Sequence, residues 1–462
     1  MRPILLAAIL TVPAVPLAGQ PASVAPHLTG SVAIDMARGT IEGRTCIGSF
    51  PATQSFILNA GLNVKRITVR GSMRRYALRD DNAATPTVGE GLVYTLRTVP
   101  APADTVCVEY VGTFPVYDIQ RGDFAITDYK GFIAFNGTTL RAAEQAKWYP
   151  IPYDSTLGAQ AHEAMTYELT VRCDACRTLY LNGAVPQPGP SATFVATRSV
   201  ALLLFAGDYS WREAGSLVLI NERLSPAAAR TLSAGVDSIA AFYGPMLGVP
   251  FGGRMTFIQH AILENNPQRR WGFVTYPTVA FSGDGLSGLV SGDSASLAPF
   301  TWAYLGHEMG HYYYGTVVRP HGALTSATES FAEFLALRVV RRFQGDSAWR
   351  ARLGGYAESW QRDSTSKALD RITAARDLHE LYRYQYLPVM LSALEGIVGT
   401  GAMDRFLRAT IQGGPRGWDY EQLKAFARQA GIAETQWMRF HEQCIRAPDH
   451  GACVVLATQR RT

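Results

Sequence analysis

The feature of this 462-residue chain that most constrains its fold is a change in the spacing of its apolar residues near residue 224. Before that point, short segments in which every second residue is apolar, such as 106–114, alternate with turns rich in Gly, Pro, Asn and Asp. This pattern is typical of β-strands with one buried face. After that point, apolar residues recur at helical spacing, beginning behind Ser225 and Pro226, which suit a helix N-cap and first turn.

A chain of this length is too long for one ordinary core, so we expect more than one domain. We expect strands over 55–58, 63–69, 92–99, 106–114, 167–173, 179–181, 200–205, 216–220 and 254–259, and helices over 226–247, 300–314, 325–343, 346–362, 386–398, 402–412 and 420–430. Strands at this spacing without helices between them predict an all-β sandwich or an open barrel, and we expect an antiparallel β-sandwich-like domain. The expected fold class is therefore α+β multidomain, with a signal peptide over 1–22, a β domain over 23–222 and a mainly helical domain over 223–462.

The N-terminus has the order of a secretory signal peptide. Arg2 precedes an apolar run over 4–17, and small residues follow it. The alternative, a buried first strand or helix, leaves this order unexplained. Because no later segment is apolar for long enough to span a bilayer, we expect a soluble, exported protein in the periplasm or outside the cell, without stable membrane insertion. The net charge of +5 comes with no dense Lys and Arg cluster, which argues against a nucleic-acid partner.

Export makes the six cysteines interpretable, because disulfides persist in oxidising compartments. One close pair flanks an Asp-Ala turn between two strand-like segments, and another brackets a short loop near the C-terminus. The alternative for the first pair is a redox or zinc motif, but no second pair or histidine lies near it. We expect three structural disulfides, which join Cys173 to Cys176, Cys444 to Cys453 and, by elimination, Cys46 to Cys107.

The segment TWAYLGHEMGHYYYG over 301–315 contains the motif HExxH. On a helix His307 and His311 share a face, so both can turn a ring nitrogen to one metal ion, while Glu308 lies beside them as a general base. The alternative is an ordinary pair of core or solvated histidines. The aromatic flanks favour burial, where two unpaired histidines are costly. Gly306 and Gly310 are poor helix formers, which indicates close approach of a substrate or another helix.

A third ligand is expected from the apolar helical segment over 325–340. Glu329 and Glu333 are four residues apart and share one face of that helix. Two carboxylates on a buried helix need partners, although a solvent-facing pair is the alternative. Glu329 as a ligand and Glu333 as the acceptor of a ligating imidazole N–H would satisfy both.

These two segments, HEMGHYYYG and ATESFAEFLAL, together resemble the gluzincin metallopeptidases of the aminopeptidase N family. The resemblance implies a thermolysin-like catalytic domain over 223–462 that hydrolyses peptides with one Zn²⁺ ion. On that pattern His307, His311 and Glu329 are the zinc ligands and Glu308 is the catalytic base. Seventeen residues, 312–328, separate the second histidine from the glutamate, one fewer than is usual in the family.

The resemblance extends to YQYLPVMLSALEGIVG over 384–399. It implies that Tyr384 donates a hydrogen bond to the oxyanion of the tetrahedral intermediate. Tyr382 and Tyr386 are close enough in the sequence to take that role if the register is shifted.

One departure concerns WGFVTYPTVAF over 271–281, which resembles the substrate-binding GxMEN strand of the family from Gly272 onward. Thr275 stands where the family has a glutamate that binds the substrate's free α-amine, and a threonine cannot pair with an ammonium group. Glu264, Asp284 or a carboxylate from the β domain are the possible replacements.

The sequence therefore predicts an exported zinc metallopeptidase, most simply an aminopeptidase. The first alternative is an endopeptidase or another amide hydrolase that uses the same zinc site, because the amine-binding glutamate is missing. The second alternative is a non-catalytic binding protein in which zinc is structural.

Overall fold

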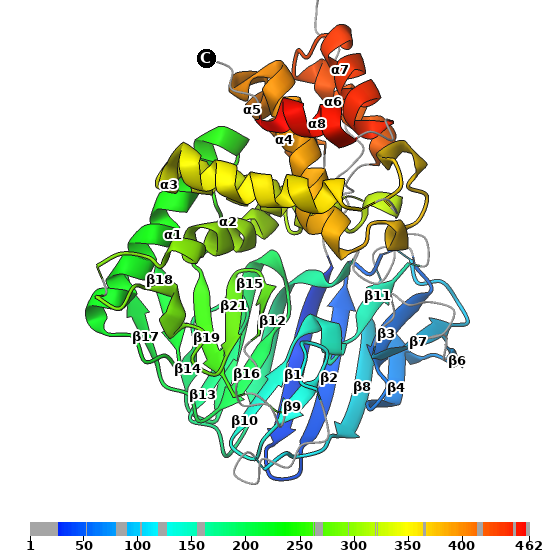
Figure 1. Cartoon of the computed structure of the whole chain (residues 1–462). Coiled ribbons are helices and arrows are strands. Elements are labelled where there is room, and N and C mark those ends of the chain that lie inside the picture. Colours follow the sequence, from blue (N-terminus) through cyan, green and yellow to red (C-terminus); the bar gives the residue numbers. More distant parts are fainter. Residues whose placement is uncertain are drawn as a thin grey trace, which may run out of the picture.

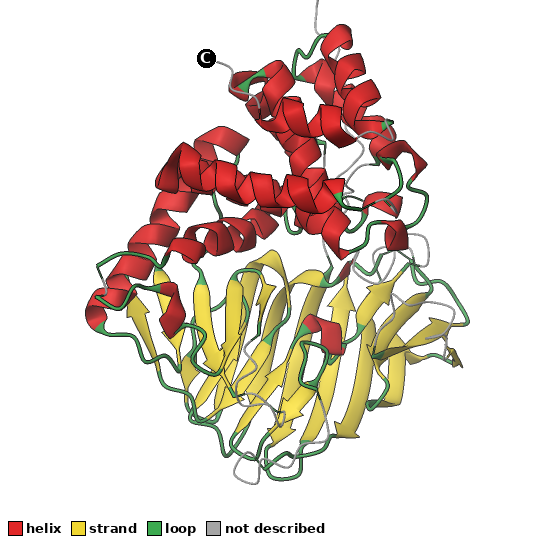
Figure 2. Cartoon of the chain, viewed as in Figure 1, coloured by secondary structure: helices red, strands yellow, loops and turns green. Residues whose placement is uncertain are grey.

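The computed structural model describes residues 26–51, 53–79, 90–101, 104–118, 127–154, 162–261, 263, 271–293, 295–318, 320, 322–363, 366–413, 419–446 and 450–458. The expected signal peptide, residues 1–22, and Glu264 lie outside the described residues. Figure 2 shows the strands gathered in one part of the molecule and most of the helices in the other. Among the described helices, none is both long and apolar enough to cross a membrane.

Three sheets form the N-terminal part. The seven-stranded sheet has the order β15 (Ser191–Ala201), β12 (Ala164–Arg172), β1 (His27–Asp35), β2 (Thr40–Gly48), β8 (Val106–Thr113), β4 (Asn63–Val69) and β5 (Ser72–Met73). The five-stranded sheet has the order β14 (Gln187–Pro188), β13 (Thr178–Leu181), β16 (Leu204–Gly207), β10 (Thr139–Ala142) and β9 (Ile133–Phe135). The four-stranded sheet has the order β11 (Ile151–Tyr153), β3 (Ser55–Asn59), β7 (Gly91–Leu96) and β6 (Tyr76–Arg79). Their inward side chains share one core, so the expected β-rich N-terminal domain is present.

The pairing within these sheets is antiparallel apart from β1 and β12, which run parallel. The alternation expected for 106–114 is present, because buried and partly exposed residues alternate along β8. The prediction of a single strand over 200–205 was wrong. The chain leaves the seven-stranded sheet at Ala201, passes through two buried leucines and enters the five-stranded sheet at Leu204. Because the apolar run is continuous through this point, the sequence pattern does not indicate the change from one sheet to the other.

A fourth sheet belongs to the helical part of the molecule. Figure 1 shows it beside α1 and α2. Its order is β17 (Trp211–Ala214), β18 (Leu217–Ile220), β19 (Thr256–His260), β21 (Thr278–Ser282) and β20 (Gly272–Thr275), which leaves β20 at an edge. Strands β18, β19 and β21 are parallel, whereas β20 is antiparallel to β21. Since β17 and β18 pair with this sheet, we propose that the domain boundary lies between Tyr209 and Trp211 and not at residue 222.

The helices are α1 (Pro226–Leu247), α2 (Pro299–Tyr313), α3 (Ala327–Gln361), α4 (Leu387–Val398), α5 (Thr400–Gln412), α6 (Tyr420–Gln429), α7 (Glu434–Phe440) and α8 (His450–Thr458). The expected start of α1 is confirmed, because Ser225 Oγ accepts the backbone N–H of Ala228 at 3.1 Å. Helix α3 is broken at Gly345, whose φ of 87° and ψ of 173° are not helical. This break separates the two helices expected over 325–343 and 346–362.

Helices α2 and α3 lie side by side above the fourth sheet (Figure 1). Two glycines of α2 make this close packing possible. A Cβ atom on Gly306 would lie 3.1 Å from Ala336 Cα, and one on Gly310 would lie 2.9 Å from Ala332 Cα. Larger residues at these two positions would push the helices apart. The neighbour that the sequence indicated for these glycines is therefore α3.

All three expected disulfides are present. One joins directly opposed residues of β2 and β8, one closes the turn after β12, and one joins the segment after α7 to α8. The bonded pairs are Cys46–Cys107, Cys173–Cys176 and Cys444–Cys453.

Candidate metal centre

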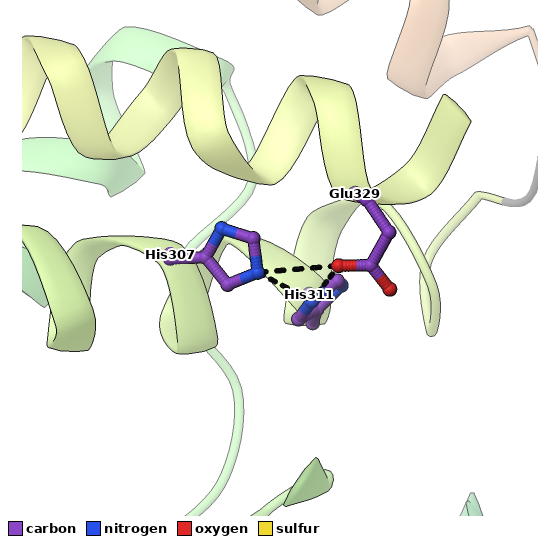
Figure 3. A group of neighbouring side chains, drawn as sticks. All are labelled: His307, His311 and Glu329. Atoms are coloured by element: carbon purple, nitrogen blue, oxygen red, sulfur yellow. Dashed lines mark hydrogen bonds and ion pairs between the residues drawn. The ribbon is translucent and has the colours of Figure 1, made fainter. Parts of the chain in front are cut away.

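Helices α2 and α3 bring three potential ligands to one point. His307 and His311 come from successive turns of α2, and Glu329 comes from the first turn of α3 (Figure 3). The two Nε2 atoms are 3.1 Å apart, and each lies 3.2 Å from Glu329 Oε2. These side chains form the one cluster of potential metal ligands found among the described residues.

The spacing and chemistry of these three atoms fit a zinc ion. Zinc binds imidazole nitrogen and carboxylate oxygen at about 2.0–2.1 Å, so two ligands of a tetrahedral site lie roughly 3.3–3.4 Å apart. The observed separations of 3.1–3.2 Å are close to that value. Two nitrogens and one oxygen leave one tetrahedral position free, which is the arrangement of catalytic and not of structural zinc sites.

The three ligand candidates and their neighbours perturb one another's proton affinities. Burial opposes a charge on His307, but hydrogen bonds to Glu329 and Glu333 outweigh it and raise the pKa of the imidazole to about 10. Burial likewise opposes the charge of Glu329, but His311 and His307 hold the pKa of that carboxyl well below its usual range. The site thus stabilises a positive charge at the point where the three side chains meet.

Glu333 lies on the far side of His307 from Glu329. Its Oε2 accepts a hydrogen bond at 2.9 Å from His307 Nδ1, which leaves Nε2 of the same ring for a metal. This is the arrangement that the sequence predicts, with Glu333 as the partner of a ligating imidazole. The other oxygen of Glu333, Oε1, contacts Arg352 and Tyr356.

Glu308 follows His307 on α2 and is only partly buried. Tyr304 lies one turn earlier on the helix, and burial together with the neighbouring charge of Glu308 raises the pKa of this tyrosine well above its usual value. Burial raises the pKa of Glu308 above its usual value, against the opposing effect of the two histidines. A raised pKa brings a carboxylate closer to the range in which a general base works well.

Tyr384 lies in a short π-helix, Tyr382–Tyr386, which leads into α4. Its ring stacks on His307 with the ring centroids 5.6 Å apart, and its hydroxyl lies close to the carboxylate of Glu329. Burial and the neighbouring Glu329 raise the pKa of Tyr384, so the hydroxyl remains protonated. Tyr382 and Tyr386 are fully buried and pack against each other, with their rings tilted by 59°. Of the three tyrosines, Tyr384 is the one that the fold brings to the candidate metal centre.

The edge strand β20 passes close to the same helix. A Cβ atom on Gly272 would lie 3.4 Å from the hydroxyl oxygen of Tyr304, the tyrosine one turn before Glu308 on α2. Thr275, at the far end of β20, is buried and donates a hydrogen bond at 2.8 Å to Glu144 of the β domain. Lys130 pairs with the same carboxylate and donates at 2.6 Å to the carbonyl of Val274. A β-domain carboxylate therefore lies beside the position where the family resemblance expects a glutamate.

Asp284, the other named replacement, has a different position. It lies in the turn that follows β21, is exposed, and its carbonyl accepts a hydrogen bond from Ser287 Oγ.

No protein-family model matches the chain, and no curated protein matches its sequence. Solved structures do match. Native yeast LTA4 hydrolase superposes with a TM-score of 0.67 and 11% sequence identity, over 90% of this chain and 66% of that one. An M1 zinc metallopeptidase mutant from Deinococcus radiodurans gives a TM-score of 0.63 at 14% identity, over 93% of this chain and 96% of that one. The chain has the fold of the M1 zinc metallopeptidases. It spans 66% of the length of the yeast enzyme.

Several residues of this M1-fold site were not predicted from the sequence. Tyr304 could have been, because it lies four residues before Glu308 on the same helix face. The other four come from distant parts of the chain, and no local pattern indicates that they contact Thr275 or Glu333. They are Lys130, Glu144, Arg352 and Tyr356.

Proposed function

We propose that this chain is a zinc-dependent metallopeptidase that acts as an aminopeptidase. The observation that carries the proposal is the convergence of His307, His311 and Glu329 at 3.1–3.2 Å, with Glu308 on the next position of the same helix. The fold supports it, because the solved structures that share this fold include M1 zinc metallopeptidases. His307, His311 and Glu329 would hold the ion.

When bound, zinc supplies a Lewis acid that polarises a carbonyl and lowers the pKa of bound water to about 7. The protein supplies the proton transfers. The carboxylate of Glu308 accepts a proton from the attacking water and delivers it to the nitrogen of the departing amine. Tyr304 lies beside that carboxylate, one turn earlier on α2. The hydroxyl of Tyr384, which lies near Glu329, donates a hydrogen bond to the developing oxyanion.

Cleavage next to a free N-terminus needs an acceptor for the substrate ammonium. Glu144 is the candidate, because Thr275 and Lys130 fix its carboxylate at the end of β20. Each carboxylate oxygen can accept more than one hydrogen bond, so both oxygens retain accepting capacity beyond these two donors. A two-domain M1 zinc metallopeptidase mutant that shares the fold was solved with L-arginine bound, at a TM-score of 0.62 and 14% identity over 96% of each chain.

A second candidate function is endopeptidase activity, and Lys130 favours it. The ammonium of Lys130 neutralises Glu144, so the attraction of this pair for a substrate ammonium is weaker than that of a free carboxylate. An enzyme that does not use the substrate amine would cleave blocked and free peptides alike.

The test compares one peptide in two forms, with a free and with an acetylated N-terminus, using zinc-loaded protein. An aminopeptidase cleaves only the free form, and Glu144→Gln then raises KM for that form more than it lowers kcat. Cleavage of both forms, unaffected by Glu144→Gln, identifies an endopeptidase. Cleavage of neither form by protein that holds zinc identifies a binding protein with structural zinc. Glu308→Gln serves as the control for contaminating peptidases.

We also propose that the protein works outside the cytoplasm. Three disulfides support this location, since such bonds persist mainly in oxidising compartments. Fractionation of cells that express the full chain tests it. Recovery of the protein in the cytoplasm with free thiols would contradict it.

A further inference from the structure

We propose that Arg352 and Tyr356 are positioning residues, which fix His307 through Glu333 and so set the affinity of the site for zinc. The inference rests on the proposed zinc site and adds to it a second layer of residues from a different segment of the chain. It concerns the affinity for the metal and not the chemical step.

The contacts of Glu333 divide between its two oxygens. Oε1 accepts from Arg352 Nε at 3.2 Å, from Arg352 Nη2 at 2.9 Å and from the hydroxyl of Tyr356. Oε2 accepts from His307 Nδ1 at 2.9 Å. Because three donors converge on Oε1, the carboxylate cannot rotate without breaking them, and Oε2 remains directed at the imidazole.

The break in α3 makes this arrangement possible. Arg352 and Tyr356 follow Glu333 by 19 and 23 residues. In an unbroken helix they would lie roughly 28 and 34 Å further along the axis, at 1.5 Å per residue. The positive φ of Gly345 instead turns the chain back, so that residues 346–361 return along residues 327–344. Glycine suits this point, because other residues rarely adopt a φ of 87°.

The fixed carboxylate has two effects on His307. It holds the proton on Nδ1, so that Nε2 carries the lone pair that a metal needs, and it sets the orientation of the ring. The side chain of Glu333 is only 5% exposed, so its charge needs a partner inside the protein. Arg352 supplies that charge. Without Arg352, the charge of the buried carboxylate would be unpaired. The carboxylate would then move toward water or another donor and away from the imidazole.

Arg352 and Tyr356 also support each other, because the guanidinium lies over the tyrosine ring at 5.4 Å. The side chain of Arg352 is 36% exposed, unlike the carboxylate that it holds. Replacing it therefore leaves no closed cavity in the core. This makes Arg352→Gln and Tyr356→Phe suitable variants, since each removes donors and retains most of the packing.

Arg341 offers a matched control on the same helix. It pairs with Asp346 at 2.8 Å and lies over the ring of Trp349 at 4.7 Å, but it does not contact Glu333 in the described structure. Arg341→Gln thus removes an arginine that has a carboxylate and an aromatic partner, away from the candidate metal centre.

The experiment measures zinc affinity by competition with a chelator, the absorption spectrum of the Co²⁺-substituted protein, and the melting temperature of the metal-free protein. We expect Arg352→Gln to weaken zinc binding by about 10- to 100-fold, the usual effect of losing a partner behind a metal ligand, and Tyr356→Phe to weaken it by less. Both variants should alter the Co²⁺ spectrum, whereas Arg341→Gln should leave it unchanged. Arg352→Gln should also lower the melting temperature of the metal-free protein more than Arg341→Gln does, because it leaves the buried charge of Glu333 without its partner.

Unchanged zinc affinity in both variants would overturn the inference while leaving the proposed zinc site intact. A weakened affinity with a parallel fall in metal-free melting temperature and an unaltered Co²⁺ spectrum would also overturn it, because a purely structural role gives that result. Absence of zinc binding in the unmodified protein would overturn the proposed function and this inference together.

Discussion

The hydroxyl of Tyr384 is the group whose removal tests the proposed chemistry most selectively. Loss of one oxyanion-hole donor costs about 2.7–4 kcal/mol of transition-state stabilisation. The hydroxyl of Tyr384 also interacts with the nearby carboxylate of Glu329, which reduces its net contribution to the transition state, so we take the lower end of that range. At 1.36 kcal/mol per factor of ten, about 2.7 kcal/mol corresponds to a fall in kcat of roughly 100-fold.

The assay is steady-state cleavage of a chromogenic peptide by Tyr384→Phe, with zinc content measured on the same sample. The ring still stacks on His307, so zinc should be retained and KM should change little. Tyr382→Phe and Tyr386→Phe are the controls, because both tyrosines are fully buried and pack against each other. A rate for Tyr384→Phe within threefold of the unmodified protein, or an equal loss in Tyr382→Phe, would refute the assignment.

Three further predictions follow from the same structure. Glu308→Gln should retain zinc while lowering kcat by about 10²- to 10⁴-fold, as measured on metal-analysed protein, since it loses the general base. Gly310→Ala should lower the free energy of unfolding in urea by about 1–3 kcal/mol, because its Cβ would lie 2.9 Å from Ala332 Cα; Gly354→Ala, where nothing lies within 4 Å, should not destabilise the protein. Burial and the charge of a neighbouring arginine hold the pKa of His260 well below 6.5, so the unfolded state binds a proton first as the pH falls. Stability should therefore decline below about pH 6.5 by up to about 1.4 kcal/mol per pH unit from this group, and urea midpoints of His260→Gln should decline less steeply.

The parts of the site that local sequence determines could be predicted. Helical spacing places His307 and His311 on one face, and the same spacing places Glu329 and Glu333 on one face of the next helix. Capping chemistry at Ser225 likewise placed the start of α1 correctly. These features depend on residues within one or two turns of each other.

The parts that depend on distant contacts could not be predicted. The two helices on either side of Gly345 were expected. That the second helix runs back along the first depends on packing, so the contacts of Arg352 and Tyr356 with Glu333 could not be predicted from the sequence. The contact of Thr275 with Glu144 joins residues 131 positions apart. The parallel pairing of β1 with β12 and the change of sheet after Ala201 are also set by tertiary structure, because an apolar run has the same pattern in either sheet.

Metal analysis of the purified protein tests the central claim most directly. After exposure to zinc and removal of loosely bound ions by dialysis, elemental mass spectrometry should find one zinc ion per chain. The same treatment of Glu329→Gln should leave far less than one, because the site loses its anionic ligand. Unmodified protein that is folded but holds no stoichiometric zinc, or equal zinc content in Glu329→Gln, would contradict the assignment of these three side chains as a metal site.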